Sequence, residues 1–220
     1  MTQSKLAQNL ATIQAELQGS PSQLLVVSKT RSVEEIRSLY LAGQRHFGEN
    51  KVQELLEKDS ALADLVDLKW HLIGHLQSNK VNKLKGITRL VAVHSVDSLS
   101  LLEKLTQTLP KSVGYFLQVN TSGESEKSGF ESLEQLQEAM AYLKRHNQQA
   151  QGLMTMGTIR TDDLAGEARR CFKNLIEIRE SLQGLQVSKL QLSMGMSGDY
   201  LIARDMGSDW VRVGSKIFTI

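Results

Sequence analysis

The chain has 220 residues, of which 40% are hydrophobic and 23% are charged, as is typical of a globular protein with one substantial core. Its 26 Lys and Arg residues nearly balance its 24 Asp and Glu residues, and the net charge of +2 favours neither a nucleic acid nor a membrane as partner. Because Cys171 is the single cysteine, the sequence excludes an internal disulfide and a cysteine-based metal site, and it suits a reducing compartment.

The N-terminal segment predicts an amphipathic helix rather than a signal peptide. Leu6, Leu10, Ile13 and Leu17 recur at helical spacing, whereas an apolar core typical of a secretory signal is missing. No apolar run reaches transmembrane length. We therefore expect a cytoplasmic protein.

Short apolar runs alternate with longer helical patterns along the rest of the chain. The runs predict eight strands, at residues 24–29, 46–50, 69–74, 89–96, 113–120, 150–157, 189–195 and 210–217. The intervening segments, such as SVEEIRSLYLAG and DSLSLLEKLTQTL, predict a helix after each of the first seven strands. "SVEE" and "DSLS" each offer an N-cap residue, and Gly43 and Gly184 offer C-terminal stops.

This alternation predicts a single domain over residues 1–220, a closed (β/α)8 barrel (TIM barrel) of the α/β class with an extra N-terminal helix. An eighth helix is not expected, since the sequence ends at Ile220, and the N-terminal helix is expected to take part of its place. The alternative is an open, doubly wound sheet. No GxGxxG motif follows the first strand, however, and eight regular units favour closure.

The first predicted strand runs into Lys29, within LLVVSKT at residues 24–30. A lysine at the rim of a barrel is by itself typical of a solvated strand end. In TIM barrels, however, the working residues lie at the C-terminal ends of the strands. Here nearly every predicted strand ends in polar residues or glycine, such as Asn50 after the second strand. The pattern predicts a pocket ringed by hydrogen-bond donors.

The last two strands predict a phosphate site. Barrels commonly bind phosphate between the loops that follow strands seven and eight, where backbone N–H groups and small hydroxyls approach the anion closely. The candidates on these loops are Ser193, Gly195, Ser197, Gly214 and Ser215. Each small residue alone is explained by a tight turn, but their occurrence on two adjacent loops favours a phosphate.

Arg212 lies two residues before Gly214, so strand alternation turns both to the same side and points the arginine into the barrel mouth. Closure pairs the first strand with the eighth and brings Lys29 into the same mouth. An amine near a cation in a poorly solvated site is a candidate nucleophile. Amine, phosphate cradle and arginine together fit pyridoxal 5′-phosphate held as a Schiff base.

Seven motifs of the sequence resemble those of the pyridoxal phosphate homeostasis proteins, which share the fold type III barrel of the alanine racemase N-terminal domain. In chain order they are VSKT, HFGENKVQE, WHLIGHLQSNK, VNTSGESEKSG, GLMTMG, LSMGMSGD and VRVGSKIF, and they span nearly the whole chain. The resemblance implies that Lys29 forms the Schiff base, that Arg212 faces the pyridine nitrogen and that Asn50 lies beside the cofactor. It also implies that four residues bind the phosphate: Ser193, Ser197, Gly214 and Ser215.

Three features depart from the family pattern. His75 stands where proline is usual, and Ser215 stands where threonine is usual. The sequence also ends at IFTI, where most members continue with a glycine and a short tail. Because serine keeps the threonine hydroxyl, the predicted phosphate contact is retained.

The residues favour a carrier over an enzyme. Carbanion chemistry favours a protonated pyridine nitrogen, normally paired with a carboxylate, whereas an arginine there keeps the nitrogen neutral and weakens the electron sink. In alanine racemase a second base comes from an additional domain and a partner subunit, whereas the barrel here accounts for all 220 residues. We expect a monomeric protein of vitamin B6 homeostasis that stores the cofactor or hands it to apo-enzymes, with no catalytic residue. The alternative is a pyridoxal phosphate-dependent amino-acid racemase, and a lysine Schiff-base aldolase is a more distant one.

Two further features are weaker signals. His71 and His75 bracket the third strand, but no acidic partner at ligand spacing accompanies them, so a metal site is not expected. Residues 120–129 (NTSGESEKSG) are polar and contain two glycines, which predicts a loop over the pocket.

Overall fold

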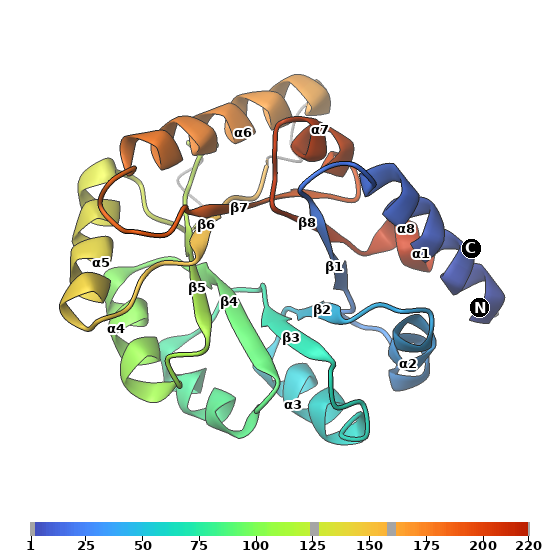
Figure 1. Ribbon diagram of the computed structural model, residues 1–220. Helices are drawn as coiled ribbons and strands as arrows, with labels where there is room; N and C mark the ends of the chain where they lie inside the picture. Colours follow the sequence, from blue (N-terminus) through green and yellow to red (C-terminus); the bar gives the residue numbers. More distant parts are fainter. Residues whose placement is uncertain (1–2, 124–127, 158–161, 220) are drawn as a thin grey trace.

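The computed structural model describes residues 3–123, 128–157 and 162–219. Eight parallel strands form a closed barrel in which each strand pairs with the next and β8 pairs with β1. The helices surround this barrel (Figure 1). The strands are β1 (Gln23–Val27), β2 (His46–Glu49), β3 (Lys69–Leu72), β4 (Leu90–Val96), β5 (Gly114–Gln118), β6 (Gly152–Met154), β7 (Gln191–Met196) and β8 (Trp210–Val213). The predicted TIM barrel is confirmed.

A helical segment follows every strand, and one more helix precedes the first. The α-helices are α1 (Gln3–Leu17), α2 (Val33–Leu41), α3 (Val52–Ala61), α4 (Leu99–Thr108), α5 (Leu133–Arg145), α6 (Leu164–Ser181), α7 (Tyr200–Asp205) and α8 (Ser215–Phe218). The segment between β3 and β4 is a 3-10 helix, η1 (Ser78–Gly86).

Local signals set the helix ends as the sequence predicts. Ser32 caps α2 in a capping box, because its side chain accepts the Glu35 N–H while the Glu35 carboxylate accepts the Ser32 N–H. Ser98 caps α4 by accepting the Leu101 N–H with its side chain, without a capping box. Gly43 follows α2 with a φ of +100°, a conformation that favours glycine.

Two predictions about helices are wrong. The helix expected between β3 and β4 is a 3-10 helix, and its buried residues Val81 and Leu84 are three residues apart, which suits three residues per turn. The expected strand 210–217 ends at Val213, and an eighth helix, α8, begins at Ser215. The apolar pair Ile217 and Phe218 is buried on that helix rather than in the barrel wall.

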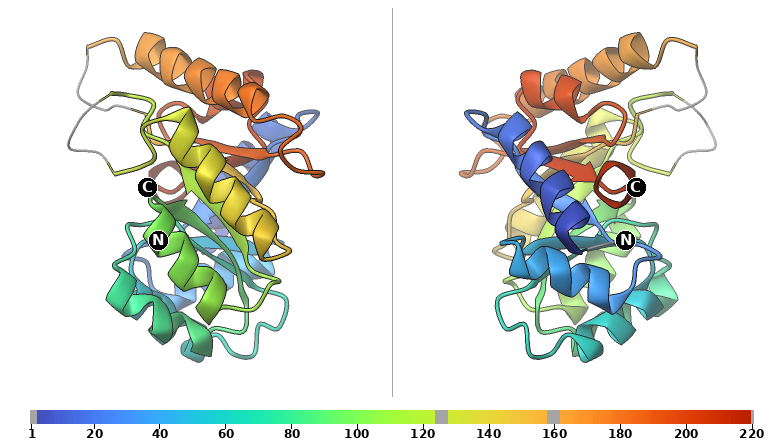
Figure 2. Two further views of the ribbon diagram at one scale, coloured as in Figure 1. Left: turned by 90° about the vertical axis from the view of Figure 1, so that its left-hand side faces the viewer. Right: turned by 90° about the vertical axis from the view of Figure 1, so that its right-hand side faces the viewer.

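The N-terminal helix does share this sector of the barrel, as expected. α1 packs against α2, α7 and α8, and the Asn9 side chain donates to the Ile217 carbonyl at 2.9 Å. Figure 2 shows α1 and α8 side by side. Because α8 spans a single turn, α1 supplies much of the apolar cover that a longer eighth helix would provide.

Several strands end earlier than the apolar runs suggest. β1 ends at Val27 rather than Lys29, β5 at Gln118 rather than Asn120, and β6 at Met154 rather than Gly157. The first residue beyond each of these ends still donates one backbone hydrogen bond to the next strand, and the residues after it form the loops at the C-terminal mouth. The polar residues predicted at the strand ends therefore lie in the loops at the C-terminal mouth, and these loops position the site.

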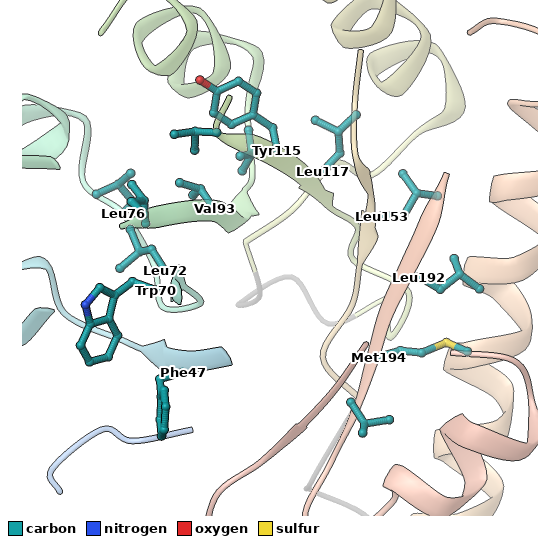
Figure 3. Packing of buried hydrophobic residues seen from close by; sticks show 14 of the residues in the cluster. Phe47, Trp70, Leu72, Leu76, Val93, Tyr115, Leu117, Leu153, Leu192 and Met194 are labelled. Carbon is teal, nitrogen blue, oxygen red and sulfur yellow. The ribbon is translucent and has the colours of Figure 1, made fainter. Parts of the chain in front are cut away.

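Apolar packing divides into two layers. The outer layer lies between the barrel and the helices and includes Leu117, Leu153 and Leu192, whose side chains stand on the outer side of their strands (Figure 3). Inside the barrel a small cluster contains Leu25, Ala92, Phe116, Met154 and Trp210. Cys171 is fully buried in the outer layer. Among the described residues, no helix is long and apolar enough to cross a bilayer.

Candidate functional site

A cavity of about 650 Å³ opens at the C-terminal mouth of the barrel. Residues from the C-terminal ends of β1, β2, β3, β5, β6, β7 and β8 and from the loops after them line it. They are Val27, Lys29, Asn50, Ile73, Gly74, His75, Gln118, Ser128, Met156, Met196, Ser197, Gly198, Arg212, Gly214 and Ser215. The predicted residues Lys29, Asn50 and Arg212 thus meet in one cavity, together with Ser197, Gly214 and Ser215.

Lys29 lies between two anchored neighbours. The Ser28 hydroxyl is buried and donates to Glu49 Oε1 at 2.6 Å, and the Ser28 carbonyl accepts from Lys58 Nζ at 2.8 Å. On the other side, the Thr30 N–H donates to Glu54 Oε2 at 3.2 Å. The Thr30 backbone has a φ of +62°, unusual for a β-branched residue, and these contacts hold it. The exposed Lys29 side chain is therefore presented to the cavity by a fixed turn.

A buried ion pair supports this turn. Lys58 Nζ lies 2.7 Å from Glu49 Oε1, and the Glu49 side chain is 0% exposed. Burial raises the pKa of the Glu49 carboxyl, while the hydrogen bonds from Lys58 and Ser28 act in the opposite direction. Glu49 Oε2 is buried without a hydrogen-bond partner among the described residues. The carboxylate thus depends on Lys58 and Ser28.

Arg212 forms the floor of the cavity. Its guanidinium is 4% exposed and donates to Ser193 Oγ at 2.7 Å and to the Thr155 carbonyl at 2.8 Å. No carboxylate of the described residues forms an ion pair with it. Burial lowers the pKa of Arg212 to about 10, and the charge of Asp199 opposes that shift. In register Arg212 pairs with Leu25, which confirms that β1 and β8 deliver Lys29 and Arg212 to one mouth.

The loops after β7 and β8 meet at the rim. The Gly214 N–H donates to Ser197 Oγ at 3.1 Å, which joins the two loops directly. A Cβ at Gly214 would lie 3.0 Å from the Val27 carbonyl oxygen, so the backbone there approaches β1 too closely for a side chain. Ser215 is exposed beside it. These three residues form a continuous rim of small polar groups.

Two of the phosphate candidates lie apart from this rim. Ser193 does not line the cavity, since its buried hydroxyl lies between Arg212 and His94 Nδ1, 2.9 Å from the latter. Gly195 turns away from the cavity. Its φ is +94°, and a Cβ there would lie 2.5 Å from the Ala203 Cβ, so the glycine allows α7 to pack closely behind β7.

A family model described as "Alanine racemase, N-terminal domain" matches residues 2–220. A "Pyridoxal phosphate homeostasis protein" of Schizosaccharomyces pombe is 41% identical over 215 residues, covering 94% of this chain and 87% of the relative. The protein of the same name from Pseudomonas aeruginosa is 37% identical, covering 98% of this chain and 95% of the relative. The chain belongs to the pyridoxal phosphate homeostasis protein family.

Solved structures agree with this family. PipY of Synechococcus elongatus without PLP superposes with a TM-score of 0.87 at 37% identity, covering 97% of this chain and 99% of PipY. PipY with PLP bound gives 0.84 at 36% identity with the same coverage. Alanine racemase of E. faecalis gives 0.75 at 17% identity, covering all of this chain and 59% of the racemase, which shows a shared fold.

Both substitutions that depart from the usual family pattern face the cavity. His75 and Ser215 line it, and His75 Nδ1 lies 3.1 Å from Asp97 Oδ2 while its side chain is 63% exposed. Within the described ranges, no group of three or more His, Cys, Asp or Glu residues could hold a metal ion. Ser128, from the loop expected over the pocket, lines the cavity and accepts a 2.7 Å hydrogen bond from Gln118; residues 124–127 lie outside the described residues.

Sequence reasoning missed two supports of this family site. Lys58 lies on the core-facing side of α3 together with Val52, Leu55 and Leu62, so its helical spacing was an available signal for a buried partner of Glu49. His94 lies within an apolar run and contacts Ser193 from the opposite side of the barrel, 99 residues away. No local pattern in the sequence indicates that contact.

Proposed function

We propose that this protein binds pyridoxal 5′-phosphate in the mouth cavity, holds it as a Schiff base on Lys29 and stores it for delivery inside the cell. The observation that carries the proposal is the donor set of the cavity, in which Lys29 and Arg212 enter from adjacent strands and small polar residues form the rim. That set matches a cofactor with an aldehyde, a ring nitrogen and a phosphate. The names of the relatives and the PLP-bound PipY structure support it.

The described cavity residues fit this cofactor. A volume of about 650 Å³ lies within the usual range of small-molecule sites. The Ser197 hydroxyl and the Gly214 N–H are already within hydrogen-bond distance of each other, so the two rim loops are close enough to bind one anion together. We assign the phosphate to Ser197, Gly214 and Ser215, and we place Asn50 beside the cofactor ring. Ser193 then acts on the cofactor through Arg212.

Formation of the Schiff base between Lys29 and the cofactor aldehyde needs no co-reactant. The Lys29 amine adds to the aldehyde carbon, and the carbonyl oxygen leaves as water, so nothing is oxidised or reduced. The bound cofactor supplies an electron-withdrawing ring. Arg212, a permanent donor held by Ser193 and Thr155, would leave the pyridine nitrogen unprotonated and so weaken that electron sink. We therefore infer storage rather than catalysis.

The exposure of the site suits handover. Lys29 and Ser215 are exposed, so another amine can reach the linkage from solvent. We infer apo-enzymes that use the same cofactor as recipients, a cytoplasmic location and a monomeric state. Mixing the loaded protein with such an apo-enzyme should restore its activity faster than the cofactor dissociates into free solution.

Lys29 provides the central test. Borohydride reduction of the loaded protein should fix the cofactor to Lys29, and Lys29→Ala should abolish both the label and the visible absorbance. Lys51→Ala is the matched control, because Lys51 is a neighbouring exposed lysine that pairs with Glu54. Mass spectrometry of the labelled peptide reads the result, and a label on any other lysine overturns the assignment.

The rim residues are tested by comparing pyridoxal phosphate with pyridoxal. Ser197→Ala and Ser215→Ala should each weaken binding of the phosphorylated aldehyde by roughly 10-fold or more, as expected for a hydrogen bond to a charged group, and leave pyridoxal binding unchanged. Ser181→Ala on α6 is the control, since its exposed hydroxyl donates to the Glu177 carbonyl on the same helix. Equal affinity of the wild-type protein for both aldehydes would contradict the assignment of the phosphate to the rim.

The rival function, an amino-acid racemase, gains support from one observation. His75 lines the same cavity as Lys29 and its imidazole is paired with Asp97, so it is a candidate second base. Incubation of the loaded protein with D- and L-alanine in deuterated water should give α-exchange no faster than the free cofactor does. Exchange well above that rate, lost in both Lys29→Ala and His75→Gln, would establish the racemase instead.

A further inference from the structure

Three histidines cross the barrel interior beneath the cavity. His46 Nδ1 lies 2.9 Å from His71 Nε2, and His71 Nδ1 lies 2.9 Å from His94 Nε2. His94 Nδ1 in turn lies 2.9 Å from Ser193 Oγ, which accepts from Arg212 at 2.7 Å. We call His46, His71 and His94 the histidine chain. None of the three lines the mouth cavity.

Strand register places each successive histidine of this chain closer to the C-terminal end of the barrel. His71 pairs with Gly48 on one side, so His46 stands two residues earlier on β2. On the other side His71 pairs with Ala92, so His94 stands two residues later on β4. His46 begins β2 and is partly exposed, whereas His71 and His94 are buried. The chain therefore runs from the N-terminal end of the barrel up to Arg212.

The hydrogens of the chain can be assigned from Arg212 outward. A guanidinium only donates, so Ser193 Oγ accepts from it. The single hydroxyl hydrogen then has His94 Nδ1 as its partner, because otherwise a buried donor would remain unpaired. His94 Nδ1 thus accepts and its Nε2 carries the hydrogen. The same step repeats at His71 and at His46, so all three are Nε2–H tautomers.

This assignment orients every dipole of the chain in one direction. Each imidazole turns its acceptor nitrogen toward Arg212 and its N–H away from it. Arg212 forms no ion pair with a carboxylate among the described residues, and the charge of Asp199 acts on it from beyond ion-pair distance. The aligned dipoles add to that stabilisation of the guanidinium charge in a poorly solvated interior. Burial holds the pKa of His71 and His94 well below the usual range and that of His46 at about 4, which keeps all three rings neutral.

Aromatic contacts hold the rings in place. His94 stacks on Phe116 with ring centroids 4.1 Å apart and an interplanar angle of 14°. The Trp210 ring lies 4.9 Å from His46 and 5.0 Å from His71, both tilted. Trp210 and Phe116 belong to the small interior cluster. The chain is thus fixed by packing as well as by hydrogen bonds.

We propose that His46, His71 and His94 form one oriented hydrogen-bond chain of Nε2–H tautomers that positions Arg212 and stabilises its charge beneath the cofactor site. Its consequence for the cofactor rests on the function proposed above, but the tautomer assignment does not. The histidines are positioning residues, since they act on the cofactor only through Ser193 and Arg212.

Nitrogen-15 NMR of the histidine-labelled, cofactor-free protein at neutral pH tests the assignment. His46, His71 and His94 should each show a protonated Nε2 and an unprotonated Nδ1. His75 and His146 provide internal controls of the opposite kind, because their Nδ1 atoms face the Asp97 carboxylate and the Tyr142 carbonyl and must donate. A protonated Nδ1 on His71 or His94 would overturn the proposal.

Two variants test whether the tautomer order is set from the Arg212 end of the histidine chain. Ser193→Ala removes the link to Arg212, so all three histidines should become tautomer mixtures, including His46 at the far end. His71→Phe should release His46 but leave His94 as the Nε2–H form, because Ser193 still donates to it. An unchanged His71 in Ser193→Ala would show that Arg212 does not set the order. If neither variant folds, the wild-type spectrum decides.

The cofactor provides the second readout. Ser193→Ala and His71→Phe should shift the visible absorbance of the bound cofactor and lower its affinity by about tenfold, the size of one hydrogen bond to a charged group. His146→Gln should change neither. Unaltered absorbance and affinity in both variants would contradict the positioning role. Wild-type protein that binds no cofactor would refute the proposed function while leaving the tautomer result intact.

Discussion

Inside the barrel, apolar side chains are few and a polar chain runs between them, whereas the layer between barrel and helices is almost wholly apolar. The interior cluster has Leu25, Phe116 and Trp210 among its members, and the histidine chain passes beside them to Arg212. The outer layer includes residues from all eight strands, and Figure 3 shows Phe47, Leu117 and Leu192 among them. The outer layer therefore holds the fold, while the interior gives up apolar packing in order to keep a cation under the mouth.

The two regions also treat their charges differently. In the outer layer, Lys58 meets Glu49 directly at 2.7 Å. In the interior, Arg212 meets a hydroxyl, a carbonyl and, through Ser193, a row of neutral imidazoles. A carboxylate in place of these partners would neutralise the guanidinium that we propose to face the cofactor. Dipoles stabilise the cation without cancelling it.

The largest expected effect is a loss of unfolding free energy at acidic pH, caused by the three histidines of the interior. The folded-state pKa of each chain histidine is lowered, to about 4 for His46. Their contribution to stability is thus complete above the unfolded pKa of about 6.5 and is lost as the pH falls toward the folded values. Each histidine adds about 1.4 kcal/mol per pH unit in that window, so the three together should give about 4 kcal/mol per unit.

Urea unfolding between pH 7 and pH 5 measures this slope. Staying above pH 5 excludes most of the titration of Asp64 and Asp67, whose pKa values are lowered by their partners and whose effect appears at more acidic pH. Burial raises the pKa values of Glu49 and Asp199, so these two carboxyls act against the histidines and reduce the total slope. His71→Gln should reduce the slope by about one third. An unchanged slope in His71→Gln would contradict a neutral histidine chain.

The ion pair of the outer layer should give the next largest effect. Lys58→Ala leaves the Glu49 carboxylate buried without its charge partner, and the free energy of unfolding should fall by about 3–5 kcal/mol. The double variant Lys58→Met with Glu49→Gln should recover part of that loss, because no charge is then buried. Chemical denaturation reads both; a loss under about 1 kcal/mol for the single variant would show that solvent reaches Glu49.

One Leu→Ala substitution in each layer should distinguish the two regions. The loss of stability should be similar for both, but the effect on the cofactor absorbance should differ. Leu117→Ala in the outer layer and Leu25→Ala in the interior should each destabilise the protein by about 2–5 kcal/mol. Only Leu25→Ala should also disturb the cofactor absorbance, because Leu25 pairs in register with Arg212. If folded Leu117→Ala and Leu25→Ala proteins showed the same change in cofactor absorbance, the proposed difference between the two layers would be wrong.

The smallest expected effect lies at the surface, away from both regions. Ser32→Ala removes the side-chain half of the capping box of α2 and should cost about 1 kcal/mol, while Ser32→Gly should cost only a few tenths. Thermal unfolding measures the pair. Neither variant should alter cofactor binding, and a change there would show that α2 transmits strain to the turn at Lys29.

The barrel and the shared mouth of Lys29 and Arg212 could be predicted because they depend on local patterns. Alternation of short apolar runs with helical segments implies closure, and two-residue spacing places Arg212 and Gly214 on one side of β8. The end of β8 could not be predicted in this way. Ile217 and Phe218 fit a strand as well as a helical turn, and contact with α1 decides between them.

By itself the sequence determined a parallel barrel, a family and a rim of small polar residues beside a lysine and an arginine, since each rests on the order and spacing of residues along the chain. Only the tertiary structure decided which partners meet across the barrel. His46, His71 and His94 are separated by 25 and 23 residues and come together through strand register, and Ser193 joins them from 99 residues away. Register and closure depend on the packing of all eight strands at once, so no single segment specifies those contacts.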